Sequence, residues 1–158
     1  MRMRAHVHAL AGVKARVVMG SLWGRRAATT CHAETIYAEI DLRPAGALPI
    51  DPEADERAVM LVGGEASLDG HALEPYALVV LRPGEAMKLS SERGGKVMLM
   101  GGEAFPNRRY VHWNFVSSSR ERIEQAKEDW RAGRFPLVPG DEEEFIPLPD
   151  KPKTVSYP

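Results

Sequence analysis

The sequence has a single cysteine, Cys31, among its 158 residues. One thiol excludes an internal disulfide framework and a cysteine-rich zinc site, and it is compatible with a reducing compartment. The chain also lacks any apolar run near the roughly 20 residues that a membrane-spanning helix needs. Its formal net charge is only −1, so the charge balance favours neither a nucleic acid nor an anionic membrane as a partner. These absences predict a cytoplasmic protein with no nucleic-acid and no membrane partner.

Short apolar segments separated by Gly, Pro and Asp fill the first 115 residues. The clearest is Thr35–Leu42, in which apolar and polar residues alternate as on a half-buried strand. The Asp69-Gly70 pair predicts a tight hairpin between Glu65–Leu68 and His71–Glu74. Further strands are expected at Val13–Met19, Ala58–Val62, Ala77–Leu81, Ala86–Leu89 and Lys96–Met100. Seven or eight short strands with tight turns predict an all-β sandwich or jelly-roll barrel.

The pattern changes after Phe115. Ser118 and Glu121 have the spacing of a capping box, and Gly133 is placed to end a helix. Between them, apolar residues recur at helical spacing, at Ile123, Ala126 and Trp130. We therefore expect one C-terminal α-helix at about 118–132. The following segment has six prolines between 135 and 158 and is expected to be irregular, with a loose tail over 150–158.

Several stretches resemble the C-terminal half of pirin-family proteins. They are Lys96–Phe105 (KVMLMGGEAF), Asn114–Phe135 (NFVSSSRERIEQAKEDWRAGRF), Gly140–Pro149 (GDEEEFIPLP), Gly12–Gly24 (GVKARVVMGSLWG) and Pro83–Leu89 (PGEAMKL). The resemblance covers about residues 12–149 and leaves residues 1–11 as an N-terminal extension, which we expect to be flexible. It implies a double-stranded β-helix, that is, a cupin or RmlC-like jelly-roll barrel. The pirin family is implied to be bicupin, and this chain resembles only the second barrel.

The resemblance also carries implications for chemistry. In typical members the first barrel is implied to hold iron through three histidines and a glutamate, and some members cleave the flavonol quercetin with dioxygen. The second barrel is implied to carry no metal as a rule. A metal-holding cupin has a His-x-His pair, which places two imidazoles on one face of a strand. Aligned on its glycines, that slot falls in Leu48–Ala54, which has no histidine, and the glutamate slot falls near Glu56 or Arg57.

The second metal motif of cupins is also incomplete here. Gly84 is in place, but the histidine slot holds Met87 and the asparagine slot holds Ser91. We therefore expect no catalytic residue, no metal and no cofactor. The weak remaining candidates for a metal ligand are Glu56, His71 at the barrel mouth, and the His6-x-His8 pair. Cys31 and His32 are neighbours without a third ligand near them in sequence, and we interpret them as a loop pair.

Two functions of different classes remain open. The first is a metal-free, non-catalytic cupin module that acts in binding or assembly. Its apolar inter-barrel face would be covered in a homodimer, or by a partner chain that supplies the first barrel. The alternative is an oxidoreductase of the quercetin 2,3-dioxygenase type, with iron supplied together with a partner barrel. A weaker third option is a metal-free barrel that binds a small carbohydrate or acid at its mouth.

Overall fold

The computed structural model describes residues 6–10 and 12–150. The chain forms two compact units, which we call the barrel unit (Met1–Ala104) and the helical unit (Phe105–Pro158). Each is described by itself. The loose tail expected at 150–158 lies outside the described residues from position 151 onward.

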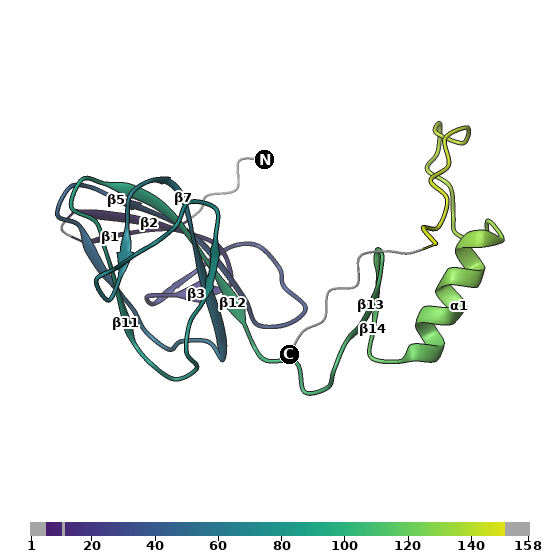
Figure 1. Ribbon diagram of the computed structural model, residues 1–158, viewed down its shortest axis with the longest axis horizontal. Helices are drawn as coiled ribbons and strands as arrows, with labels where there is room; N and C mark the ends of the chain where they lie inside the picture. The colour runs from purple at the N-terminus through teal and green to yellow at the C-terminus, as the bar shows by residue number, and fades with distance from the viewer. Residues whose placement is uncertain (1–5, 11, 151–158) are drawn as a thin grey trace. The chain divides into compact units, whose positions relative to one another are not determined.

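Two antiparallel sheets build the barrel unit (Figure 1). The larger has the order β1-β2-β5-β12-β7-β10, with the bounds β1 (His6–Leu10), β2 (Val13–Met19), β5 (Thr35–Leu42), β12 (Gly95–Gly102), β7 (Glu56–Gly64) and β10 (Leu78–Val80). The smaller has the order β6-β11-β8-β9, with β6 (Ala47–Ile50), β11 (Met87–Ser90), β8 (Ser67–Leu68) and β9 (His71–Ala72). A short separate hairpin joins β3 (Ser21–Leu22) to β4 (Arg25–Arg26).

Aliphatic side chains fill the space between the two sheets. On β5 every second residue is buried, as the alternation in Thr35–Leu42 predicts. The largest side chains with almost no exposed surface come from both sheets: Val17, Ile40, Leu48, Ile50, Val59, Leu61, Leu89, Val97 and Leu99. Branched aliphatic residues suit this position because they pack well on a pleated surface. The jelly-roll cupin fold is thus confirmed.

The hairpin predicted at Asp69-Gly70 is also confirmed. Leu68 pairs with His71 across a two-residue turn, and both turn residues have positive φ, 47° and 82°, which is the conformation Asp-Gly favours. Two features differ from the prediction. Ala47–Ile50, for which no strand was predicted, forms β6, because Leu48 and Ile50 point into the core on either side of exposed Pro49. Residues 6–10, expected outside the barrel, pair with β2 as its edge strand.

The helical unit consists of a hairpin, β13 (Tyr110–His112) and β14 (Phe115–Ser117), followed by α1 (Arg120–Arg131) and an irregular segment. The cap prediction is wrong by one residue. Ser119, not Ser118, is the N-cap, and its hydroxyl accepts from the Arg122 N–H at 3.2 Å. Because β14 extends to Ser117, one more residue is needed before the chain turns into the helix. Gly133, at φ 65°, follows the C-cap as predicted.

Within residues 6–10 and 12–150, no helical segment reaches the length and apolar character that crossing a bilayer requires.

Candidate functional site

The barrel interior at the expected metal slots is apolar. Leu48 and Ile50, in the segment aligned with the His-x-His pair, are at most 1% exposed and belong to the core. Met87, in the second histidine slot, also packs against that core. Glu56, the best placed carboxylate, begins β7 and is exposed. None of these side chains gives a metal a set of ligands in the barrel.

The residue next to Glu56 points inward instead. Arg57 shares the inner face of β7 with Val59 and Leu61 and is only 2% exposed. Its guanidinium donates four hydrogen bonds to backbone carbonyl oxygens. Nη1 lies 3.2 Å from Ile50 O and 3.1 Å from Asp51 O, and Nη2 lies 2.7 Å from both Arg82 O and Glu85 O. The glutamate slot of a metal site is therefore next to a buried cation, which would repel a metal ion.

The histidines are spread over the chain. His71 is exposed on β9, the edge strand of the smaller sheet. His6 and His8 are on β1, opposite Val17 and Ala15. His112 belongs to β13 of the helical unit. Among the described residues, no three His, Cys, Asp or Glu side chains are grouped in a way that could hold a metal ion. The ligand set that the resemblance implies for iron does not fit this barrel.

A cavity of about 370 Å³ opens where β2, β5 and β12 reach one end of the larger sheet. Its polar lining comes from segments far apart in sequence: Arg26, Cys31, His32, Glu34, Glu53 and Glu103. The carboxylate of Glu53 accepts from the backbone N–H of Trp23, with both oxygens at 3.2 Å. The structure therefore places Cys31 and His32 at a cavity at the end of the barrel. The sequence analysis had expected His71 at the barrel mouth, and His71 does not line this cavity. Nothing in the spacing of these residues indicated that they would meet.

The outer side of the larger sheet carries an apolar surface, which we call the apolar face: Met60, Leu78, Val80, Met98 and Met100, with Tyr76 in the turn before β10. Strand register brings the five strand residues together, because Met98 and Leu78 both lie opposite Met60, and Met100 and Val80 both lie opposite Ala58. The three methionines are partly exposed. Tyr76 and Val80 are each 74% exposed and Leu78 is 55% exposed. Large exposed apolar side chains gathered on one side of a sheet are a candidate for a contact surface.

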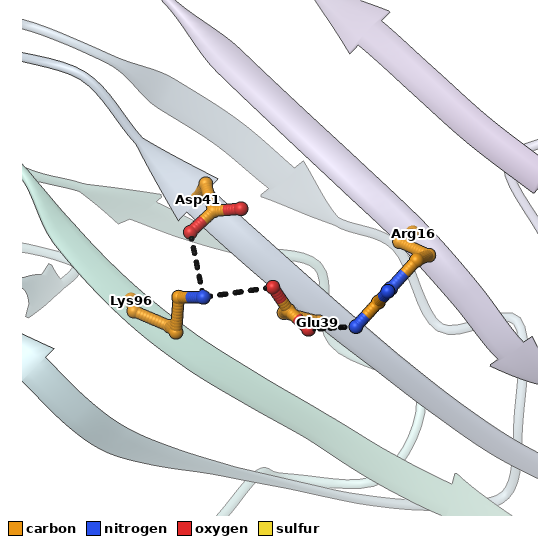
Figure 2. Close-up of polar contacts among 4 residues, drawn as sticks. All are labelled: Arg16, Glu39, Asp41 and Lys96. Atoms are coloured by element: carbon orange, nitrogen blue, oxygen red, sulfur yellow. Dashed lines mark hydrogen bonds and ion pairs between the residues drawn. The ribbon is translucent and has the colours of Figure 1, made fainter. Parts of the chain in front are cut away.

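A cluster of charges borders the apolar face on the same sheet. Figure 2 shows a chain of contacts from Arg16 of β2 through Glu39 of β5 and Lys96 of β12 to Asp41 of β5. Glu39 is paired with Arg16, and the Lys96 ammonium lies 2.8 Å from Glu39 and 3.3 Å from Asp41. The hydrogen bond from Lys96, with the contribution of Arg16, lowers the pKa of Glu39, and Glu39 in turn raises the pKa of Lys96. Both signs of charge are therefore neutralised within this cluster.

Comparison with known proteins supports the resemblance. Residues 37–136 match the family model of the pirin C-terminal cupin domain. A pirin-like protein of Caulobacter vibrioides is 39% identical over 139 residues, which cover 88% of this chain and 48% of that protein. A Pseudomonas aeruginosa protein, named provisionally as a quercetin 2,3-dioxygenase, is 28% identical over 148 residues, 89% of this chain and 47% of that protein.

Solved structures agree on the fold. A quercetin 2,3-dioxygenase from Acinetobacter baumannii superposes with a TM-score of 0.83 at 23% identity, over 97% of this chain and 52% of that one. The chain thus spans about half the length of the curated relatives it matches.

Proposed function

The chain belongs to the pirin C-terminal cupin domain family, and from this premise we propose that it is a non-catalytic barrel that pairs with a second copy of itself through the apolar face. The observation that carries the proposal is the exposure of Tyr76, Leu78 and Val80 on the edge strand of the larger sheet and the turn before it. The aliphatic core and the buried Arg57 support the non-catalytic part. A cytoplasmic location belongs to the same proposal, because the single cysteine fits a reducing compartment.

The occupant proposed for this surface is a second copy because the surface is self-complementary. A two-fold pairing sets the same patch against itself, so apolar side chains meet apolar side chains. The bordering charges of Figure 2 are already neutralised in pairs, so a second copy meets no excess of like charge. An exposed apolar edge strand such as β10 is also a liability in a free monomer, and pairing removes it.

The test is the oligomeric state of the purified full chain. We expect sedimentation or light scattering to give a dimer that dissociates on dilution, and Leu78→Glu to give a monomer with an unchanged far-UV circular dichroism spectrum. Ala72→Glu, on the exposed edge strand β9 of the other sheet, is the matched control and should remain dimeric. A monomer at all concentrations, or a dimer that Leu78→Glu leaves intact, contradicts the proposal; the first result would direct the search to a separate partner chain.

The alternative is a dioxygenase of the quercetin-cleaving type. It is favoured by the names of the Pseudomonas and Acinetobacter proteins described above. Since no described set of side chains in this barrel is grouped to hold iron, the metal would have to come with a partner barrel. We expect the isolated chain, after incubation with Fe(II), to contain substoichiometric iron and to leave quercetin unchanged. Stoichiometric iron together with flavonol turnover would establish the alternative.

A further inference from the structure

Arg57 is a buried cation that pairs with no carboxylate of the described residues. The residue is 2% exposed, and the four hydrogen bonds of its guanidinium go to main-chain carbonyls. Burying an unpaired charge costs several kcal/mol unless it is well hydrogen-bonded, and Nε has no hydrogen-bond partner among the described residues. A buried charge that is held by four main-chain carbonyls indicates a specific structural role.

The four carbonyls come from two turns at the same end of the barrel. Ile50 and Asp51 lie where β6 leaves the sheet, and Arg82 and Glu85 flank the turn at Gly84, whose φ of 72° favours glycine. These are the segments aligned with the two metal motifs. Carbonyl oxygens that converge on one positive centre are also how proteins surround a hard metal ion. Here the carbonyl oxygens surround the planar guanidinium of Arg57, a cation that is part of the chain.

We infer that Arg57 is a built-in cation that replaces a metal ion in holding these two turns together. The guanidinium joins Ile50–Asp51 to Arg82–Glu85, as a metal bridging both motifs would. It also leaves neither a ligand set nor a favourable field for a metal ion at this end of the barrel. Arg57 thus supplies a positive charge at an end of the barrel where the described side chains form no metal-binding group.

The hydrogen bonds of Arg57, which we call the Arg57 clamp, also affect the cavity at the barrel end. The segment between Asp51 and Arg57 contains Glu53, which lines the cavity and binds the Trp23 N–H. It also contains Asp55, whose carboxylate accepts from the Ala104 N–H at 3.1 Å. By fixing the start of this segment, Arg57 fixes the wall of the cavity and the point where the chain leaves the barrel.

Hydrogen exchange of the full chain tests the clamp, with Arg57→Met as the main variant and Arg82→Met as the control. The Arg82 side chain is 79% exposed, and its substitution leaves the carbonyl acceptor in place. It removes only an exposed ion pair with Glu85 at 3.5 Å, which contributes little to stability. We expect exchange in peptides covering 50–56 and 81–86 to accelerate together by about tenfold or more in Arg57→Met, since charged hydrogen bonds are lost at both turns. Arg82→Met should match the parent protein. Unchanged exchange in Arg57→Met would overturn the inference.

Two further measurements keep the test decisive if Arg57→Met fails to fold. Arg57→Lys keeps the charge, but a single ammonium lacks the fork that reaches both pairs of carbonyls, so both turns should still exchange faster than in the parent. Titration of the parent protein with Fe(II) or Ni(II) needs no variant, and we expect no added protection at 50–56 or 81–86. Metal-dependent protection of these two turns, or a Lys variant indistinguishable from the parent, would overturn the inference.

Discussion

The barrel unit and the helical unit differ in the contacts that stabilise the interior of each. The barrel unit closes on a buried aliphatic core drawn from strands distant in sequence. The helical unit has one buried hydrophobic residue among its described residues, Ile123. It relies on rings in mutual contact, which we call the aromatic cluster: Trp113, Phe115, Trp130, Phe135 and Phe145.

The two kinds of packing make different contributions to the free energy of unfolding. Core burial contributes about 25 cal/mol per Å² of apolar surface and is shared by the whole barrel. Aromatic pairs add about 0.5–1.5 kcal/mol each beyond their burial, and here several of the rings remain partly exposed, with Phe135 at 38% and Phe145 at 59%. We therefore expect the helical unit to open locally at a lower free energy than the barrel.

The largest effect is expected from truncation of the barrel core. Leu99 is 1% exposed between β5 and β7, so Leu99→Ala removes packing that the rigid core recovers only in part. We predict a loss of about 2–5 kcal/mol in the free energy of unfolding, measured by urea denaturation. Val116→Ala, at a 62% exposed position of the helical unit, is the control and should change stability by about 0.5 kcal/mol or less. Equal losses in the two variants would abolish the contrast between the units.

A smaller and local effect is expected from Trp130→Ala. Trp130 contacts four other rings, and its indole N–H donates to Ile146 O at 2.9 Å. We predict a loss of about 1–3 kcal/mol confined to the helical unit, because several aromatic pairs are lost at once. Hydrogen exchange should rise in α1 and in the β13–β14 hairpin while the barrel strands stay protected.

The control for Trp130→Ala is Phe105→Ala. Phe105 is 64% exposed and contacts the Arg109 guanidinium, 4.3 Å from the ring centroid, outside the aromatic cluster. It should leave exchange in α1 unchanged. If Trp130→Ala destabilises the barrel strands as much as α1, then the two units do not open independently.

The smallest effect is expected from acid, and it should reach the helical unit first. Burial, together with the charge of Lys127, lowers the pKa of His112, while Glu124 acts in the opposite direction and Arg131 in the same one. A lowered pKa means that the folded state favours the neutral ring. The stability that neutral His112 contributes to the folded state is therefore complete above the ordinary histidine pKa of about 6.5. It declines as the pH falls from there through the lowered pKa.

In the barrel, the corresponding group is Glu39, whose pKa is lowered by Lys96 and Arg16. Its contribution is complete above the ordinary carboxyl pKa and is lost only as the pH falls through that lower range. We predict that the protection factors of α1, corrected for the intrinsic exchange rate at each pH, fall between neutral and mildly acidic pH while those of the barrel strands stay constant. His112→Phe should remove this step. A pH response of α1 that persists in His112→Phe would assign it to another group.

Much of the fold could be predicted from local sequence. Alternation in Thr35–Leu42, the Asp69-Gly70 turn and Gly133 after the helix each reflect short-range physics, namely side-chain period, positive φ and helix ending. The strand β6 escaped prediction because Pro49 and the acidic residues after it resemble a loop. The exact cap also escaped, because Ser118 and Ser119 are chemically equivalent and only the end of β14 distinguishes them.

The candidate site also has features that could be predicted from the sequence and features that could not. The lack of histidines at the metal slots could be read from the sequence, since a missing ligand needs no geometry to establish. Arg57 was named only as a residue near the glutamate slot, and its inward position was not predicted, although its spacing with Val59 and Leu61 indicates it. A charged residue at an inward position is uncommon without a partner, and the partners here are backbone carbonyls, which a sequence pattern does not display.

By itself, the sequence determined the strand periods, the tight turn, the helix and the absence of the metal-binding histidines, because each depends on residues a few positions apart. Only the tertiary structure decided which carbonyls surround Arg57, that Cys31, His32 and Glu53 line one cavity, and that Met60, Leu78 and Met98 form one surface. Those arrangements depend on the register between strands distant in the chain, and a shift of one residue would turn every side chain to the opposite face.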